Sequence, residues 1–410
     1  MKIVHINWSD TEGGAAIAAS RHCEAMKLVG IDAKLLTIVK GGRKPYVKKI
    51  HLGIRIIHAQ LFSLLYEKAI KRLHAIGTFS IMKYGHPFHK DIEIQTADVI
   101  IIHWVNHCCM SLKNIENILK LGKPTFWYMH DMFPITGGCH HSLSCEAYKF
   151  ECKDCPLIRN KKQKSVAAKQ LKHKIMHWGK YGNLNFITPS RWLGECVKNS
   201  TLSKGHNVFV IPNVINTDVF HPEKSELKTL LGLNPSKKTV IFSAATYANV
   251  YKGAKYMHDF LEKLDPQKYE ALAIGLTNDE FIKDLNVKIV STGYLNDDLS
   301  MVVAYNCSDV LVISSVAENY PNVVLEAMAC GVPCVGFPVG GIKDLIVHKE
   351  TGYVTKNLCI EELIEGVKYV IADEDRYKLL SMKSRDLVVR YNSFKNVKEI
   401  YREVPFLFNE

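Results

Sequence analysis

The sequence predicts an α/β protein made of two doubly wound, Rossmann-like domains that face a cleft. Short runs rich in β-branched and other apolar residues alternate with longer amphipathic runs along the chain. Near-continuous apolar strands that alternate with helices are typical of parallel sheets buried on both faces. The pattern occurs twice, with a break at residues 210–223, "VIPNVINTDVFHPE". We therefore expect a first domain of residues 1–207 and a second of residues 208–388.

The expected strands follow one another in chain order, with helical patterns between most of them. Such helices are needed because parallel neighbours must be joined by a crossover connection. In the first domain the expected strands are residues 2–6, 32–38, 98–104, 124–130 and 185–190. In the second domain they are residues 208–213, 239–245, 270–275, 287–293, 309–315 and 333–338.

The composition is that of a globular protein with a sizeable core. The chain has 410 residues, of which 47% are hydrophobic and 23% are charged. It contains no apolar run of about 18 residues, as a membrane-spanning helix would need. Its start, "MKIVHINWSD", lacks the apolar core of a signal peptide. We expect a cytoplasmic protein whose 12 cysteines are thiols or metal ligands, because the cytosol is reducing.

Positive charge is concentrated in the first half of the chain. Residues 1–205 carry a net charge of +17, whereas residues 206–410 carry −5. The excess falls in residues 40–90 and 159–193, and favours an anionic partner such as a membrane surface. The alternative is two solvated helical faces. Within the first stretch, residues 48–84 mix an apolar stripe with basic residues, which fits an interfacial helix or a helix that covers the sheet.

Two glutamates flank the start of an expected helix in the second domain. Strand 309–315 is followed by the loop "VAENYP", which contains Glu318, and then by the helix "NVVLEAMAC", which contains Glu326. Gly331 occupies a C-cap position, and Pro333 follows it. In such a βαβ unit, ligands bind beyond the carboxyl end of the strand, where the helix N-terminus favours a phosphate.

A carboxylate beside that phosphate would repel it, so we expect Glu326 to serve another part of the ligand. A ribose diol fits, because two hydroxyls that donate to one carboxylate form strong charge-assisted hydrogen bonds. We expect Glu318, at the strand end, to contact a sugar, and Lys252, after strand 239–245, to neutralise the phosphates. The alternative is that a glutamate near a helix start only complements the helix dipole.

The chain resembles one enzyme family over nearly its whole length. Residues 318–354 resemble the donor-site motif, with its E-x7-E signature, of the retaining nucleotide-sugar glycosyltransferases of group 1, or family 4. These enzymes have the GT-B architecture. Residues 10–26 resemble their N-terminal glycine loop and first helix, and residues 188–197 and 210–222 resemble the segments that lead into their second domain. Residues 391–404 resemble the helix that crosses back to the first domain, so we expect residues 389–410 to do so.

The resemblance implies roles for the residues of the second domain, which would bind the nucleotide-sugar. Glu326 would bind the ribose hydroxyls, Glu318 would contact the transferred sugar, and Lys252 would neutralise the diphosphate. Backbone groups around the sugar and the diphosphate would come from Asn319, Tyr320, Pro321, Asn322 and Val323. Many family members carry a second phosphate-binding cation, an arginine, where this chain has Thr246.

The resemblance also implies roles in the first domain, which would lie on the acceptor side. Gly13 and Gly14 would let the backbone approach the phosphates closely. His130, in "WYMHDMFP", matches a histidine that follows a strand and lines the sugar pocket, so it and Glu318 are the expected catalytic residues. Closure around the donor is expected to move the acidic second domain against the basic first domain.

The implied reaction is sugar transfer with retained anomeric configuration. It is expected to proceed by front-face displacement, with the leaving diphosphate helping to deprotonate the acceptor and with no metal required for catalysis. The expected donor is a UDP- or GDP-sugar. The expected acceptor is a saccharide, lipid-linked at the inner membrane face, in bacterial surface or exopolysaccharide biosynthesis, which would place the protein as a peripheral partner of that membrane.

A cysteine-rich loop, residues 139–155, follows His130. Cys139, Cys145, Cys152 and Cys155 are spaced C-x5-C-x6-C-x2-C, with two histidines beside the first. A C-x2-C pair with two further thiols fits a structural tetrahedral zinc site. The segment also resembles an insertion of the colanic-acid branch of the family. The alternatives are a redox-sensitive or disulfide-paired loop, or unmodified thiols in a folded loop.

Two other functions compete with glycosyl transfer. One is another enzyme of GT-B architecture, such as a sugar-nucleotide epimerase, which would act on its donor with no acceptor present. The other is a non-enzymatic, zinc-stabilised protein that holds polyanions, which the charge asymmetry and the cysteines favour. We expect no nucleic-acid partner, because the sequence lacks the interleaved aromatic and basic residues typical of single-strand binding.

Overall fold

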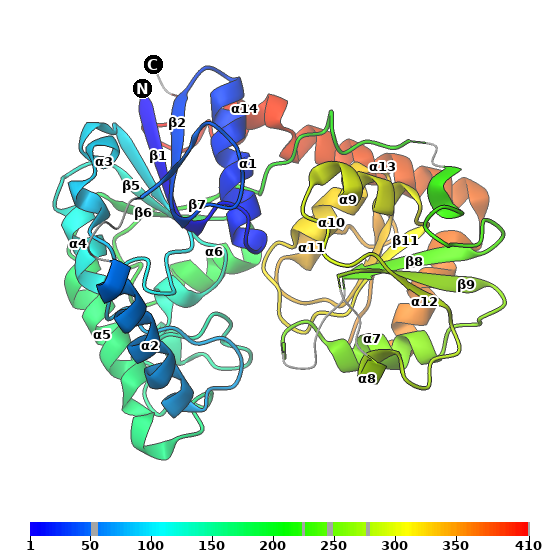
Figure 1. The fold of residues 1–410 in the computed structure, drawn as a ribbon, viewed down its shortest axis with the longest axis horizontal. Coiled ribbons are helices and arrows are strands. Elements are labelled where there is room, and N and C mark those ends of the chain that lie inside the picture. The colour runs from blue at the N-terminus through cyan, green and yellow to red at the C-terminus, as the bar shows by residue number, and fades with distance from the viewer. Residues whose placement is uncertain (51–55, 224–225, 244–248, 276–278, 409–410) are drawn as a thin grey trace. The chain divides into compact units, whose positions relative to one another are not determined.

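The computed structural model describes residues 1–50, 56–223, 226–243, 249–275 and 279–408 (Figure 1). It divides the chain into two compact units. Unit 1 comprises Met1–Val214 and Val397–Glu410, and unit 2 comprises Ile215–Asn396. Each unit is a parallel sheet with helices on both faces, so the expected fold class of two doubly wound α/β domains is confirmed.

The sheet of unit 1 is parallel throughout and has the order β3-β2-β1-β4-β5-β6-β7. Its strands are β1 (Lys2–Ser9), β2 (Asp32–Val39), β3 (Val47–Lys49), β4 (Val99–Ile102), β5 (Thr125–Tyr128), β6 (Leu184–Thr188) and β7 (Val208–Val210). The central strands β4, β5 and β6 are buried along their whole length, which explains their continuous apolar runs.

One strand lies in a different sheet from the one expected. The run 208–213 was expected to open the second domain, but β7 pairs in parallel with β6 at the edge of the unit 1 sheet. The apolar pattern identifies the run as a strand, but it carries no information about which neighbour will accept its hydrogen bonds. The division between the units accordingly follows Val214, whereas the sequence analysis places it after residue 207.

The helices of unit 1 connect its parallel strands and cover the sheet. They are α1 (Gly14–Leu28), α2 (Ile56–Leu73), α3 (Ile92–Thr96), α4 (Leu112–Leu119), α5 (Ser165–Trp178), α6 (Arg191–Lys198) and α14 (Val397–Ile400). α5 joins the core through Trp178, whose ring lies 5.0 Å from that of Trp127 in β5. α2 contributes Leu73 to the core but leaves the side chains of Leu64 and Leu65 65% and 42% exposed.

The sheet of unit 2 is also parallel and has the order β10-β9-β8-β11-β12-β13. Its strands are β8 (Lys238–Ser243), β9 (Tyr269–Ile274), β10 (Ile289–Ser291), β11 (Val310–Ile313), β12 (Cys334–Gly336) and β13 (Gly352–Val354). Its helices are α7 (Ala254–Glu262), α8 (Asp279–Ile282), α9 (Asp298–Asn306), α10 (Asn322–Ala329), α11 (Ile342–Leu345), α12 (Ile360–Ile371) and α13 (Glu374–Asn392).

Alternate residues of the unit 2 strands enter two separate cores, as the two-residue period of a strand requires. Ile241 of β8 packs in a core with α9 and α10. Val240 and Phe242 of the same strand pack on the opposite face, with α7 and α12. Figure 1 shows α9 and α10 on one side of this sheet and α7 on the other.

The chain leaves unit 2 after Asn396, shortly after the end of α13. Asn392 ends that helix, and its carbonyl accepts a 2.8 Å hydrogen bond from the backbone N–H of Ile215. The following short helix, α14, belongs to unit 1, where the hydroxyl of Tyr401 lies 2.9 Å from Nδ1 of His22. Within the described ranges, no helix combines the length and the apolar character needed to cross a membrane.

Candidate active site

The strand order of unit 2 reverses at β8 and β11, which are neighbours although β9 and β10 lie between them in sequence. From β8 the chain proceeds toward one edge of the sheet, and from β11 it proceeds toward the other. In open α/β sheets, ligands bind outside the carboxyl ends of the strands at such a switch point. The segments that follow these two strands carry Lys252 and Glu318.

Lys252 and Glu318 form an ion pair. Nζ of Lys252 donates to Oε2 of Glu318 at 2.6 Å, and the hydroxyl of Ser315 donates to the same oxygen at 3.3 Å. The Lys252 side chain is 41% exposed and that of Glu318 is 14% exposed. The structure therefore brings together the expected phosphate-binding cation and the expected sugar-binding carboxylate.

Backbone contacts hold the two loops in place. The backbone N–H of Val316 donates to the carbonyl of Tyr251 at 2.8 Å. Gly253 has a φ of +64°, and a Cβ at this position would lie 2.0 Å from the carbonyl oxygen of Ser314. A glycine is thus required directly after Lys252, because any side chain would force the loops apart.

Glu326 lies beside this pair in sequence but in a different environment. It is the fifth residue of α10, only 3% exposed, and it accepts a 2.9 Å hydrogen bond from the hydroxyl of Tyr305 in α9. The first turn of α10 contains no acidic residue. A glutamate that only complements the helix dipole acts from the first turn at the surface. The burial and position of Glu326 therefore do not fit that alternative.

The residues between the two glutamates form the entry to α10. Pro321 is the N-cap residue, and no side chain caps the helix, so its positive dipole end lies at Asn322 and Val323. Asn319 is buried, and the hydroxyl of Tyr320 accepts a 3.0 Å hydrogen bond from the Asn392 side chain. Thr246, which matches the second cation of the family, lies outside the described residues.

In unit 1, the two glycines that follow β1 begin α1. Gly13 is the N-cap residue with a φ of +87°, a conformation that other residues adopt only under strain. Its carbonyl accepts the first helical hydrogen bonds, from the N–H groups of Ala16 and Ile17 at 3.1 and 3.2 Å. Gly14 is the first helical residue, and both glycines are exposed.

His130 belongs to a chain of three histidines that the sequence analysis did not find. Nε2 of His130 lies 3.0 Å from Nδ1 of His103, and Nε2 of His103 lies 2.9 Å from Nδ1 of His5. Consecutive rings are stacked with centroids 5.2 Å apart. These residues lie in or directly after β1, β4 and β5, which are adjacent in the sheet but distant in sequence. The sequence does not give the order of the strands, and that order is what places these three histidines next to one another.

The three histidines are neutral at physiological pH. Burial lowers the pKa of His5 to about 3. Burial also lowers the pKa of His130 to about 4, although the neighbouring Asp131 carboxylate acts in the opposite direction. The pKa of His103 is well below its ordinary value, because of its burial and the neighbouring histidines.

The hydrogen bonds also indicate which nitrogens carry protons. Among the described residues, Nε2 of His5 is buried and has no hydrogen-bond partner. A buried N–H without an acceptor is rarer than a buried acceptor without a donor, so the proton of His5 is favoured on Nδ1. His5 then donates to His103, and His103 donates to Nε2 of His130. The proton of His130 is thereby placed on Nδ1.

The residue after His130 is fixed by its own network. Oδ2 of Asp131 lies 2.5 Å from Nδ1 of His140 and accepts from Nε1 of Trp104 at 3.1 Å. Oδ1 accepts from the backbone N–H of Phe133 at 2.8 Å. Burial alone would raise the pKa of Asp131, but the interactions with His140 lower it, so Asp131 is ionised. The short turn that carries His130 is thus rigidly connected to the cysteine-rich loop.

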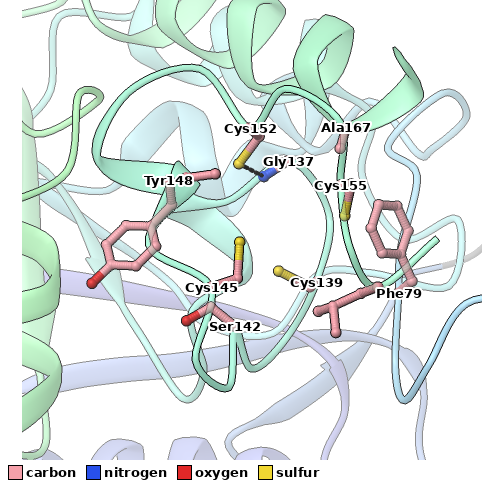
Figure 2. A pocket seen from close by; sticks show the side chains of 11 residues that line it. Phe79, Gly137, Cys139, Ser142, Cys145, Tyr148, Cys152, Cys155 and Ala167 are labelled. Atoms are coloured by element: carbon pink, nitrogen blue, oxygen red, sulfur yellow. Dashed lines mark hydrogen bonds between the residues drawn. The ribbon is translucent and has the colours of Figure 1, made fainter. Parts of the chain in front are cut away.

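The four cysteines of that loop line a single pocket, and their side chains point into it (Figure 2). Burial raises the pKa of Cys139 to about 12 and that of Cys152 to about 11. Without a bound cation, the thiols of Cys139 and Cys152 are therefore protonated.

Comparisons with known proteins agree with this fold. Residues 237–373 match the family described as Glycosyl transferases group 1. A relative in Escherichia coli K12, named as a colanic acid biosynthesis glycosyl transferase, WcaC, is 23% identical over 90% of each chain. An uncharacterized glycosyltransferase of Methanocaldococcus jannaschii is 28% identical over 56% of this chain and 63% of its own length.

Among solved structures, HepE of Anabaena in complex with UDP and glucose superposes with a TM-score of 0.66. It covers 98% of both chains at 16% sequence identity, so the likeness concerns the fold. The resemblance drawn from the sequence to the group 1 glycosyltransferases is confirmed, and residues 237–373, which carry Lys252, Glu318 and Glu326, are a domain of this kind.

Proposed function

We propose that this protein, with its group 1 glycosyl transferase domain, transfers a sugar from a nucleotide-diphosphate sugar to a saccharide acceptor and retains the anomeric configuration. One observation carries the proposal. Glu326 is a buried carboxylate with a neutral tyrosine donor, in the helix that begins at the switch point of the group 1 domain. A buried carboxylate is costly unless it is well hydrogen-bonded. A ribose diol would supply two further donors.

The ion pair between Lys252 and Glu318 supports separate roles for these residues. In the absence of donor, each neutralises the other. A bound diphosphate carries more negative charge than one carboxylate, so it would draw Lys252 away and release Glu318 to accept hydrogen bonds from the sugar hydroxyls. The uncapped start of α10, at Asn322 and Val323, would add the helix dipole to the stabilisation of the diphosphate.

The proposed reaction is a front-face displacement. An acceptor hydroxyl oxygen forms a bond to the anomeric carbon while the bond from that carbon to the β-phosphate oxygen breaks. The proton of the acceptor hydroxyl passes to the leaving diphosphate, so the charges balance without a protein nucleophile. The residues of the site orient the reactants and stabilise the charge that develops on the diphosphate, and we propose that the reaction requires no metal ion.

His130 is proposed to line the sugar pocket in its neutral form. Its lowered pKa excludes a role as a cation at neutral pH. The hydrogen bonds among the three histidines favour a proton on Nδ1 of His130. His130 would therefore donate a hydrogen bond, which suits a sugar hydroxyl oxygen.

The acceptor is proposed to be lipid-linked and to lie at an anionic membrane surface. The exposed leucines Leu64 and Leu65 are followed on α2 by exposed Lys68, Lys71 and Arg72, and apolar and basic residues together suit such a surface. The relationship to a glycosyl transferase named for colanic acid biosynthesis supports a role in surface polysaccharide. Sedimentation with phosphatidylglycerol vesicles, but not with phosphatidylcholine vesicles, is the expected result.

The test of the function is a transfer assay with a panel of UDP- and GDP-hexoses and p-nitrophenyl glycoside acceptors. We expect one donor to yield a disaccharide whose new bond has the anomeric configuration of the donor, as shown by NMR. Glu318→Gln should lose most of this activity, whereas Lys378→Gln, at an exposed residue of α13, should retain it.

Two outcomes would contradict the proposal. Conversion of the donor to an epimer or to free sugar, with no transfer to any acceptor, would indicate a sugar-nucleotide epimerase. The second outcome is salt-sensitive binding of polyanions that is equally strong in the parent and in Glu318→Gln, while the nucleotide-sugar stays unchanged. It would indicate a binding protein rather than an enzyme.

A further inference from the structure

The cysteine-rich loop of unit 1 forms a site that glycosyl transfer does not use. Its pocket is lined by the thiols of Cys139, Cys145, Cys152 and Cys155, with Phe79, Tyr148 and Leu157 around them. Figure 2 shows the four sulfur atoms directed toward the same space. The open volume between them is about 10 Å³, which is about the space that one water molecule or one metal ion occupies.

The backbone of the loop is arranged to stabilise thiolates. The N–H of Gly137 donates to Sγ of Cys152 at 3.2 Å. Hydrogen bonds from N–H groups to ligand sulfurs are the usual outer contacts of a thiolate metal site, because they orient the sulfurs and spread their charge.

A buried lysine beside the loop supplies a second, independent observation. Lys174 of α5 is 0% exposed, and its Nζ donates to the carbonyls of Phe133 and, at 2.9 Å, Thr136. It also lies 3.7 Å from the centroid of the Phe133 ring. Among the described residues, no carboxylate forms an ion pair with it. A buried ammonium normally requires a compensating negative charge.

The neighbouring histidine does not belong to the ligand set. Both ring nitrogens of His140 are engaged, Nδ1 with Asp131 at 2.5 Å and Nε2 with the hydroxyl of Ser80 at 2.9 Å. Neither histidine that follows Cys139 lines the pocket, so the donor set is the four thiols that do, which is the composition of a closed structural zinc site.

We propose that Cys139, Cys145, Cys152 and Cys155 bind one Zn²⁺ as thiolates, and that Lys174 offsets part of the charge of this centre. Binding converts four S–H groups to four Zn–S bonds and releases four protons, which leaves a centre of charge −2. The ammonium of Lys174 would offset one of these two negative charges.

The sulfurs must draw together when the metal binds. Zn–S bonds of about 2.3 Å in a tetrahedron place the sulfurs roughly 3.8 Å apart. In the structure, no three of the four sulfurs lie within 4.8 Å of one another. Among the described residues, the one group of three ligating atoms that are this close belongs to His258, Asp259 and Glu262. The metal would therefore tighten the loop between Cys139 and Cys155. Because His140 follows Cys139 and contacts Asp131, this would stiffen the turn that carries His130.

The first measurement is the metal content of the full chain, expressed with zinc and purified without chelators. We expect about one zinc per chain by mass spectrometry. The double variant Cys152→Ser/Cys155→Ser should contain none, and the control Cys359→Ser, at a half-buried cysteine of unit 2, should retain the parent value. Replacement of zinc by Co²⁺ should give the thiolate-to-metal absorption of a tetrahedral tetrathiolate site.

The cobalt spectrum is measured on the parent protein, so it remains decisive if the double variant does not fold. Absence of zinc together with 12 titratable thiols in the denatured protein would overturn the proposal in favour of unmodified thiols. Absence of zinc with fewer thiols would overturn it in favour of disulfides. A cobalt spectrum without thiolate absorption would also overturn it.

Discussion

Lowering the pH from about 7 to about 5 should destabilise unit 1 through its buried histidines. The unfolded chain takes up protons near pH 6.5, the ordinary pKa of histidine. In the folded protein, burial lowers the pKa of His5 to about 3 and that of His130 to about 4, so neither takes up a proton at pH 5. The unfolded state then binds more protons than the folded state. Stability is therefore fully present above pH 6.5 and is lost as the pH falls toward the folded pKa values.

The size of this loss of stability depends mainly on the pKa of histidine in the unfolded chain. For a histidine that stays neutral when folded, the loss between about pH 7 and about pH 5 is roughly 1.9 kcal/mol. His5 and His130 together should therefore cost unit 1 close to 4 kcal/mol, a large part of a typical stability of about 5–15 kcal/mol. His103, whose pKa is also lowered, should add to this loss.

Tryptophan fluorescence during urea unfolding measures this stability for unit 1 alone. All five tryptophans lie in unit 1, at Trp8, Trp104, Trp127, Trp178 and Trp192. The variant His5→Gln should reduce the pH dependence by about 1.9 kcal/mol over the same interval. The control His173→Gln, at an exposed residue of α5, should leave it unchanged. A stability that is equal at both pH values would refute the burial argument, as would equal pH dependence in the parent and in His5→Gln.

Three further predictions concern the site. Glu318→Gln frees Lys252 from its ion pair, so it should tighten UDP or GDP binding while transfer activity falls. Weaker nucleotide binding in calorimetry would show that Glu318 and the diphosphate do not compete for Lys252. Lys252→Met should weaken nucleotide binding by at least tenfold and reduce its salt dependence, and an unchanged dissociation constant would exclude Lys252 from the phosphate site. His103→Phe removes the donor to His130, so it should lower kcat more than it raises KM, and unchanged kinetics would show that the histidine chain does not position His130.

The local parts of the site could be predicted from the sequence because they depend on consecutive residues. The strand, loop and helix around Glu318 and Glu326 lie within one βαβ unit, and the structure has them as β11 and α10. Lys252 was expected after the strand 239–245, and the structure has it between β8 and α7, in an ion pair with Glu318. The positive φ of Gly331 agrees with its expected C-cap position.

The features that were missed depend on contacts between distant segments. One is the pairing of β7 with the sheet of unit 1, and another is the set of contacts among His5, His103 and His130. Both follow from the order of the strands in the sheet, which no local sequence pattern encodes. Lys174 was counted with the basic stretch 159–193, but it is buried among backbone carbonyls of another segment. Of the five three-residue strands, β3 and β13 were missed, whereas β7, β10 and β12 lie within longer runs that were predicted as strands.

The most direct test of the central claim is nucleotide binding by the parent and by Glu326→Gln in a thermal-shift panel of UDP, GDP, CDP and dTDP. Glutamine can still accept from Tyr305 but lacks the charge, so we expect the matching nucleotide to bind about thirtyfold more weakly. At one hundred times the parent Kd, its stabilisation should fall from about 2.7 to about 0.9 kcal/mol. Tyr305→Phe, which leaves the carboxylate in place, should stay close to the parent. One diphosphate that stabilises the parent strongly and Glu326→Gln weakly would support the donor site and name the nucleotide. Equal shifts in both proteins, or no shift with any nucleotide, would contradict it.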